Sequence, residues 1–353
     1  MDYRQYLNEL LTFTAQNGGS DLHLSPGNYP VIRIDGRLTY LTNKKILDRA
    51  TSEGLIFTLL GEARKEKFLV EKETDFSYDH ADKIRFRVNT YFSRGDVAAT
   101  LRLIPSDIKT LEELNLPDIL KVFCKLSQGF VLLVGPNGHG KSTTLAAMID
   151  LINKDRAEKI VTIEDPIEYI FTPNKSIIDQ REIDQDTLSF HKALRSTFRQ
   201  NVNVIMVGEM RDHETMSTAV MAAETGHLVF ASLHTNSASQ TVERIIDSFP
   251  PNQQQQIRTQ LASTISGIIS QRLIPGIKGG LVPAVEVMVA TNAIRNLILD
   301  NRIRQIDIVI ETSQDMGMIS LDRSLADLVR RKLVTLEKAE FYSLSPNNIK
   351  SFL

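Results

Sequence analysis

The residues with the clearest chemistry are eight in a row, Gly-Pro-Asn-Gly-His-Gly-Lys-Ser at positions 135–142. They match the pattern G-x-x-x-x-G-K-[ST] of a phosphate-binding P-loop. Its glycines let backbone N–H groups converge on an anion, while the lysine supplies a cation for the β- and γ-phosphates and the serine a hydroxyl for Mg²⁺. The residues expected to bind the nucleotide are Gly135, Pro136, Asn137, Gly138, His139, Gly140, Lys141, Ser142 and Thr143.

The sequence on either side of this loop favours a P-loop over an ordinary Gly-rich turn. Residues 130–134 form a continuous apolar run, which is typical of a strand buried on both faces of a parallel sheet. Residues 143–153 place their apolar side chains at helical spacing. The motif therefore has a strand before it and a helix after it, and an α/β fold is expected.

Acidic residues follow two further strand-like runs. Glu164, Asp165 and Glu168 come after the run at 159–163, and Glu209 comes after the run at 202–207. Ligands of open α/β sheets gather at the carboxyl ends of strands, where a carboxylate can hold Mg²⁺ or deprotonate a water. We expect Glu209, Glu164 and Glu168 to be catalytic, and Ser142, Glu164 and Asp165 to hold the metal. The choice of general base stays open, as does a role for these acids as loop or N-cap residues.

Two histidines bracket a third strand-like run. His227 opens the run and His234 closes it, so the two side chains face opposite sides of a strand. His234 lies at the carboxyl end, where it could sense a γ-phosphate. Both are expected to be catalytic, with a structural role left open for His227.

The composition limits the class of protein. The chain has 353 residues, with 41 basic against 43 acidic side chains and one cysteine. These numbers predict two domains without a disulfide framework or a multi-cysteine zinc site. The start carries Asp2 and Glu9 rather than the basic segment of a secretory signal, and no apolar run is long enough to span a membrane. A cytoplasmic location is expected.

The chain divides by pattern into a small α/β unit and a larger one. Alternating polar and apolar residues around positions 21–25 and 84–89 predict strands in the first hundred residues. We expect an N-terminal domain over 1–104, a linker over 105–116 and an ATPase domain with a C-terminal helical region over 117–353.

Together these residues resemble the secretion ATPase superfamily, in which they would be the Walker A, Asp-box, Walker B and His-box motifs. Further segments are similar to the type IV pilus retraction branch of that superfamily. The motifs that carry the resemblance lie at 135–142, 161–169, 207–212, 226–236, 85–89, 179–182, 193–195, 243–250 and 293–297. The resemblance implies a PAS-like N-terminal domain, a RecA-like P-loop NTPase domain and a homohexameric ring that hydrolyses ATP.

The resemblance also implies how such a ring works. Arg85, Arg87 and Arg102 would reach the phosphates of a neighbouring subunit as arginine fingers, although Arg85 and Arg87 also suit a solvated sheet face. The segment 293–297 would form a helix that couples hydrolysis to pilus retraction and twitching motility, with a purely structural helix of the C-terminal bundle as the alternative. The partner would be the pilus platform protein, with the motor peripheral at the inner membrane.

Two other functions remain open on the sequence. One is a secretion ATPase that serves no pilus. The other is a RecA-like motor on nucleic acid, which the net charge of −2 and the lack of a basic stretch interleaved with aromatic residues disfavour.

Overall fold

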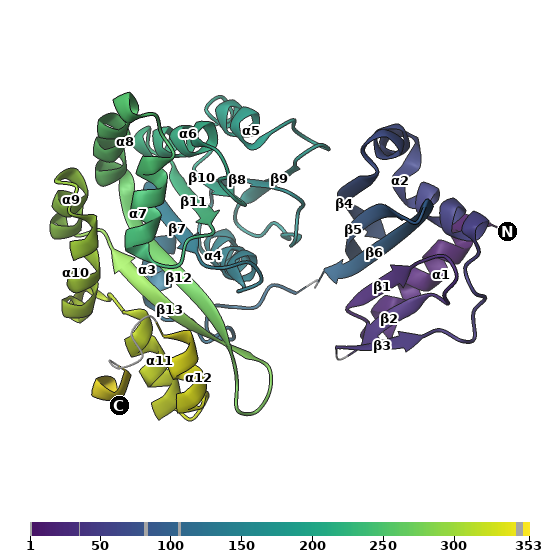
Figure 1. Ribbon diagram of the computed structural model, residues 1–353. Coiled ribbons are helices and arrows are strands. Elements are labelled where there is room, and N and C mark those ends of the chain that lie inside the picture. The colour runs from purple at the N-terminus through teal and green to yellow at the C-terminus, as the bar shows by residue number, and fades with distance from the viewer. Residues whose placement is uncertain (1, 35, 81–83, 105–106, 344–348) are drawn as a thin grey trace. The chain divides into compact units, whose positions relative to one another are not determined.

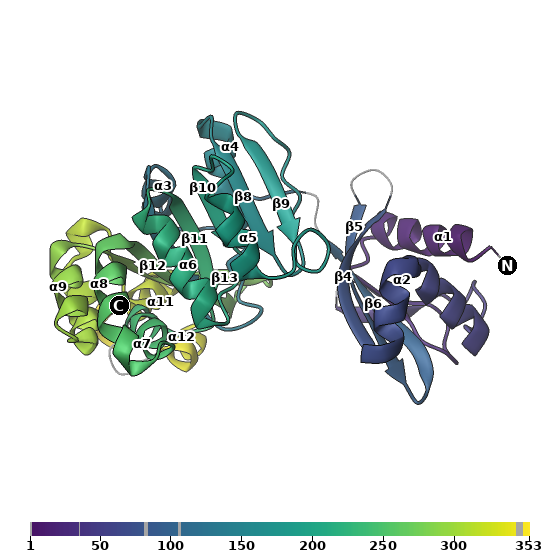
Figure 2. The same cartoon turned by 90° about the horizontal axis from the view of Figure 1, so that it is seen from above.

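The computed structural model describes residues 2–34, 36–80, 84–104, 107–343 and 349–353. The chain forms two compact units, which are described separately (Figures 1 and 2). The first comprises Met1–Asp107 with the segment Asp165–Ile170, and the second comprises Ile108–Glu164 and Phe171–Leu353. Residues 105 and 106, where the linker is expected to begin, lie outside the described part. None of the described helices is both long enough and apolar enough to cross a bilayer.

The first unit is an antiparallel sheet with two helices. The strands lie in the order β3-β2-β1-β6-β5-β4. Its elements are α1 (Tyr3–Gln16), β1 (Asp21–Leu24), β2 (Val31–Ile34), β3 (Arg37–Tyr40), α2 (Arg49–Glu71), β4 (Glu73–His80), β5 (Ile84–Ser93) and β6 (Asp96–Ile104). Asp2 and Asp48 cap the two helices, each accepting a hydrogen bond from the backbone N–H three residues on.

The core of this unit lies between one face of the sheet and both helices. Leu10 of α1 and Leu55 of α2 pack in one buried cluster with Leu22, Phe86 and Leu101 of the sheet. Figure 2 shows α2 lying along β4 and β6. The residues between these apolar positions therefore point to the other face, where polar side chains from five strands form one row. In register order this row is Arg33, Asp21, Arg102, Arg87 and Ser77.

The second unit is a sheet of seven strands in the order β13-β12-β7-β11-β10-β8-β9. All neighbours are parallel except β12 and β13, which form an antiparallel pair at one edge. The strands are β7 (Gly129–Val134), β8 (Lys159–Glu164), β9 (Ile177–Glu182), β10 (Val204–Val207), β11 (Leu228–Leu233), β12 (Ile265–Pro275) and β13 (Leu281–Val289). Strands β7, β10 and β11 are buried along their whole length, as their continuous apolar runs predict.

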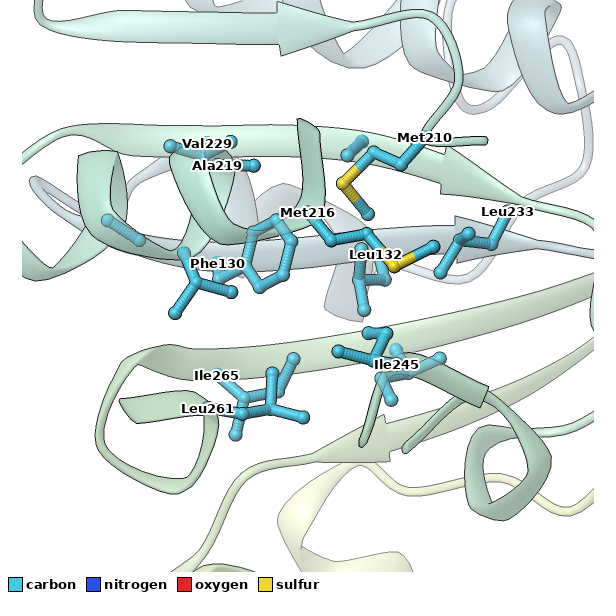
Figure 3. Packing of buried hydrophobic residues seen from close by; sticks show 14 of the residues in the cluster. Phe130, Leu132, Met210, Met216, Ala219, Val229, Leu233, Ile245, Leu261 and Ile265 are labelled. Carbon is cyan, nitrogen blue, oxygen red and sulfur yellow. The ribbon is translucent and has the colours of Figure 1, made fainter. Parts of the chain in front are cut away.

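Helices complete the second unit. They are α3 (Ile119–Cys124), α4 (Lys141–Asp155), α5 (Phe190–Thr197), α6 (His213–Glu224), α7 (Ala238–Asp247), α8 (Pro251–Thr264), α9 (Asn292–Leu299), α10 (Ile306–Thr312), α11 (Leu321–Arg330) and α12 (Leu336–Tyr342). Figure 3 shows the main core, where Phe130 and Leu132 of β7 meet Met216 of α6, Ile245 of α7 and Leu261 of α8. In Figure 1, α9 and α10 lie beside α7 and α8. The helices α11 and α12 form a separate cluster on β12 and β13.

Candidate nucleotide-binding site

The P-loop connects β7 to α4. Gly138 and Gly140 both adopt left-handed backbone conformations, with φ of 76° and 79°. Gly140 is also the N-cap of α4, so the free N–H groups of the first helical turn follow the loop directly. The loop therefore presents the amides and the helix end that bind phosphate groups.

Lys141 is held at the mouth of this loop. Its side chain is buried, and Nζ donates hydrogen bonds to the carbonyl oxygens of Gly135 at 2.8 Å and Pro136 at 2.9 Å. Nζ also lies 3.2 Å from Nδ1 of His234, which follows β11. A lysine ammonium has only donors, so Nδ1 is the acceptor and the neutral His234 ring carries its proton on Nε2.

That Nε2 atom faces Glu209. It lies 3.4 Å from Oε2 of Glu209, while Oε1 of Glu209 pairs with the guanidinium of Arg211. The turn that carries Glu209 is fixed to β11, because Ser232 Oγ donates to the Gly208 carbonyl at 2.5 Å. Lys141, His234 and Glu209 thus form one hydrogen-bonded chain across the ends of β7, β11 and β10.

Glu164 ends β8 as a buried carboxylate. Its Oε1 accepts hydrogen bonds from Thr162 Oγ1 at 2.6 Å and Gln180 Nε2 at 3.4 Å. Thr162 precedes Glu164 by two residues on the same face of β8, and Gln180 lies opposite Thr162 in the register of β9. Two neutral donors therefore orient this carboxylate. Both lie in segments that carry the family resemblance, 161–169 and 179–182, but neither was expected as a site residue.

The structure does not bring His227 to the phosphate end of the sheet. The residue precedes β11, and its Nδ1 lies 2.9 Å from the carbonyl oxygen of Ala222, near the end of α6. A strand of six residues, about 20 Å, separates it from His234. The expectation of catalysis by His227 is therefore unsupported within one chain, and its contacts are structural.

The acids near the strand ends do not all behave alike. Asp212 is the N-cap of α6 and accepts from the Thr215 N–H at 2.7 Å, as the N-cap alternative predicts. Asp165 is exposed and, with Glu168, belongs to the segment that joins the first unit. Glu168 lies 3.5 Å from a terminal nitrogen of Arg87.

The three candidate arginines are all engaged on the polar face of the first unit's sheet. Arg85 is buried, and its guanidinium donates to Asp79 at 2.8 Å and contacts Ser77. The Arg102 side chain is 71% exposed, and its Nε donates to Asp21 at 3.0 Å. Arg87 is 43% exposed. Arg85 is the most buried of the three, so it is the least accessible to the phosphates of another subunit.

The expected metal site is sparse in protein ligands. Ser142 is exposed in the first turn of α4, where a hydroxyl could bind a cation held by phosphates. Across the described residues, no three His, Cys, Asp or Glu side chains gather into a metal cluster. Because Mg²⁺ bound to a nucleotide keeps waters and phosphate oxygens as ligands, Ser142 still suits the expected role, which stays a prediction.

Comparison with known proteins places the chain. Residues 4–280 match the family model described as Type II/IV secretion system protein. The chain belongs to that family. A relative in Pseudomonas aeruginosa, "Type IV pilus retractation ATPase PilT", is 43% identical over 97% of this chain and 99% of its own length. The "Twitching motility protein" of Neisseria gonorrhoeae is 42% identical over 88% of this chain and 83% of its own.

A solved structure of this secretion family has the same fold. It is the "Pilus Retraction Motor PilT and Bound ADP", which superimposes with a TM-score of 0.90 at 43% identity and covers 98% of both chains. The resemblance to the pilus retraction branch and the two-part α/β fold predicted from the sequence are thereby confirmed.

Proposed function

We propose that this chain is a Mg²⁺-dependent ATPase that drives type IV pilus retraction as a homohexamer. The hydrogen-bonded chain from Lys141 through His234 to Glu209 carries the ATPase part of the proposal. The pilus part rests on the relatives, which include a PilT retraction ATPase and a twitching motility protein. The match to the PilT retraction ATPase extends over 97% of this chain, so it includes both units.

The site residues divide the work of hydrolysis. Lys141 binds the β- and γ-phosphates, with the P-loop amides and the first turn of α4 around them. Mg²⁺ bound to the nucleotide would neutralise phosphate charge, and Ser142 would supply one of its protein ligands. Glu209 takes a proton from the attacking water while the bond from the γ-phosphorus to the β-phosphate oxygen breaks, releasing ADP and phosphate. His234 holds the Glu209 carboxylate in position and links it to Lys141.

Glu164 is the alternative base, assisted by Glu168 of the neighbouring acidic cluster. Glu164 already accepts two hydrogen bonds at Oε1, whereas Oε2 of Glu209 faces the imidazole that touches Lys141. We therefore assign the base to Glu209 and give Glu164, with Asp165, a part in holding the metal. The proposal includes the expected domains, which are a PAS-like domain over 1–104, a linker over 105–116 and a RecA-like domain over 117–353.

Coupling to the pilus runs through α9, which contains the segment 293–297. We infer different tasks for its residues, because Arg295 donates to the carbonyls of Ala262 and Ser263 at 2.5 and 2.8 Å, near the end of α8. Asn296 is exposed. Arg295 is therefore a structural residue, and Asn296 belongs to the surface that would meet the platform protein, with the ring on the cytoplasmic side of the inner membrane.

The proposal is tested with purified full-length protein and in cells. Release of phosphate from Mg-ATP should be absent in Lys141→Ala and unaffected by added single-stranded DNA. In cells that lack their own retraction ATPase, the wild-type gene should restore twitching, and Asn296→Ala should reduce it while leaving phosphate release unchanged. Hydrolysis that requires DNA would contradict the proposed pilus motor and favour a nucleic-acid motor. Failure of the wild-type gene to restore twitching would contradict the role in pilus retraction.

A further inference from the structure

Strand β12 forms a wall behind the P-loop, although it lies about 130 residues later in the chain. Gln271 lies near the middle of this strand, with 2% of its surface exposed. A Cβ atom added at Gly135 would lie 2.3 Å from the backbone oxygen of Gln271, and one added at Gly140 would lie 2.9 Å from its Nε2. Both ends of the loop thus pass as close to Gln271 as glycine permits.

The Gln271 side chain makes two hydrogen bonds to the nucleotide-binding segment. Nε2 donates to the backbone oxygen of His139 at 2.9 Å, and Oε1 accepts from Thr144 Oγ1 at 2.8 Å. The His139 carbonyl can only accept, so the orientation of the amide group follows from its partners. The next residue but one, Leu273, donates its N–H to Nδ1 of His139 at 2.9 Å.

The bond to His139 determines where an important donor points. The His139 carbonyl and the Gly140 N–H belong to one peptide unit, which is planar and trans, so the two groups point in opposite directions. With the carbonyl directed at Gln271 of β12, the Gly140 N–H is directed away from that side chain. Because Gly140 can adopt φ of either sign, the alternative orientation of this peptide is accessible, and a contact outside the loop helps to select one.

We propose that Gln271 is a positioning residue for nucleotide binding. It keeps the 139–140 peptide in the orientation that donates to phosphate and holds the first turn of α4 through Thr144. It does not touch the nucleotide itself. The proposal rests on the proposed function, because it assumes that the P-loop of this chain binds a nucleotide.

The experiment measures ADP affinity of the full-length protein by titration calorimetry. Gln271→Met keeps the length of the side chain and removes both hydrogen bonds, so we expect the Kd for ADP to rise about tenfold. Thr144→Val removes only the bond that does not orient the peptide, and its Kd should rise less than threefold. Gln260→Met on α8 is the matched control and should leave the Kd unchanged. Turnover at saturating ATP should stay within about threefold of wild type in Gln271→Met, because the defect is in binding.

The outcomes separate this inference from the proposed function. A folded Gln271→Met that binds ADP as tightly as wild type refutes the inference and leaves the ATPase intact. A wild type that binds ADP but hydrolyses no ATP refutes the proposed function alone, and a wild type that binds no ADP refutes both. Where Gln271→Met fails to fold, Gln271→Glu replaces it, since it keeps the acceptor for Thr144 and turns an oxygen toward the His139 carbonyl. It should weaken ADP binding at least tenfold, and unchanged affinity there contradicts the inference.

Discussion

Charged groups are arranged in opposite ways in the two units. On the polar face of the first sheet, arginines pair with acids of the strands beside them, as Arg102 does with Asp21 at 3.0 Å. In the second unit, Lys141, His234 and Glu209 lie beyond the carboxyl ends of three parallel strands, with Lys141 as the first residue of α4. An antiparallel register sets opposite charges side by side and satisfies them locally. Parallel strands instead collect polar groups at one edge, where they can share a ligand.

The largest effect should come from the edge of the second unit. Glu209→Gln keeps the shape of the side chain but cannot take a proton, so turnover should fall by up to about 10⁴-fold while ATP binding persists. Phosphate release and ATP titration measure the two separately. Turnover near the wild-type rate would return the base to Glu164.

The next effect tests whether the first unit contributes to catalysis at all. If Arg87 acts on a neighbouring subunit's phosphates, Arg87→Ala should lower turnover by about 10³-fold. A mixture of Arg87→Ala with Glu209→Gln should then regain activity that neither protein has alone, because some sites combine an intact Glu209 with an intact neighbouring Arg87. Mixed rings verified by native mass spectrometry but inactive would limit Arg87 to its contact with Glu168. Arg85→Ala is the matched control and should mainly lower the melting temperature.

The two histidines that bracket β11 give a comparison within one strand. His234→Asn loses the N–H that faces Glu209 and should lower turnover about 10²-fold, the cost of misplacing a catalytic group by about 1 Å. His234→Gln can still donate from the Nε2 position and should retain more activity. His227→Ala should change turnover less than threefold. Equal losses at both histidines would contradict the assignment.

The smallest effect compares one buried acid from each unit. Burial raises the pKa of Glu286 on β13 to about 7, against one hydrogen bond from the Ala238 N–H. Burial also opposes ionisation of Asp21, but hydrogen bonds from Ser20 and Arg102 leave its pKa below the ordinary value. The contribution of Glu286 to stability is therefore complete below its unfolded pKa and is lost as pH rises through 7, while that of Asp21 is present above its unfolded pKa and is lost in acid.

Chemical unfolding as a function of pH measures this contrast. Glu286→Gln should raise the free energy of unfolding on the order of 2 kcal/mol at pH 8 and change it little at pH 5, because the amide carries no charge to bury. Asp21→Asn should lower the free energy of unfolding at both pH 5 and pH 8. A Glu286→Gln variant that gains nothing at pH 8 would show that the carboxylate is compensated in the folded state.

Local sequence determined the parts of this protein that depend on local geometry. The P-loop, its strand and its helix are contiguous, so spacing alone predicted β7, the loop and α4. The apolar runs before Glu164, Glu209 and His234 likewise predicted three strands and put their polar ends at one edge. No strand was expected at β4, β9, β12 or β13. The first three carry polar or mixed residues and owe their extended form to pairing with neighbouring strands, whereas β13 is mostly apolar and its run was not identified as a strand.

Only the tertiary structure decided which of the expected site residues meet. Residue type left both His227 and His234 as catalytic candidates, and chain order placed only His234 at the carboxyl end of the strand. The contact between His234 and Lys141 came from the fold, which sets β11 beside β7. Nothing in the sequence pointed to Gln271, since a neutral polar residue in a strand acquires its role from what the fold places beside it. Thr162 lies within the 161–169 motif, but its hydrogen bond to Glu164 appears only in the structure. A motif identifies reactive residues within one segment of the chain. Contacts between strands that are far apart in the sequence then determine how those residues are positioned.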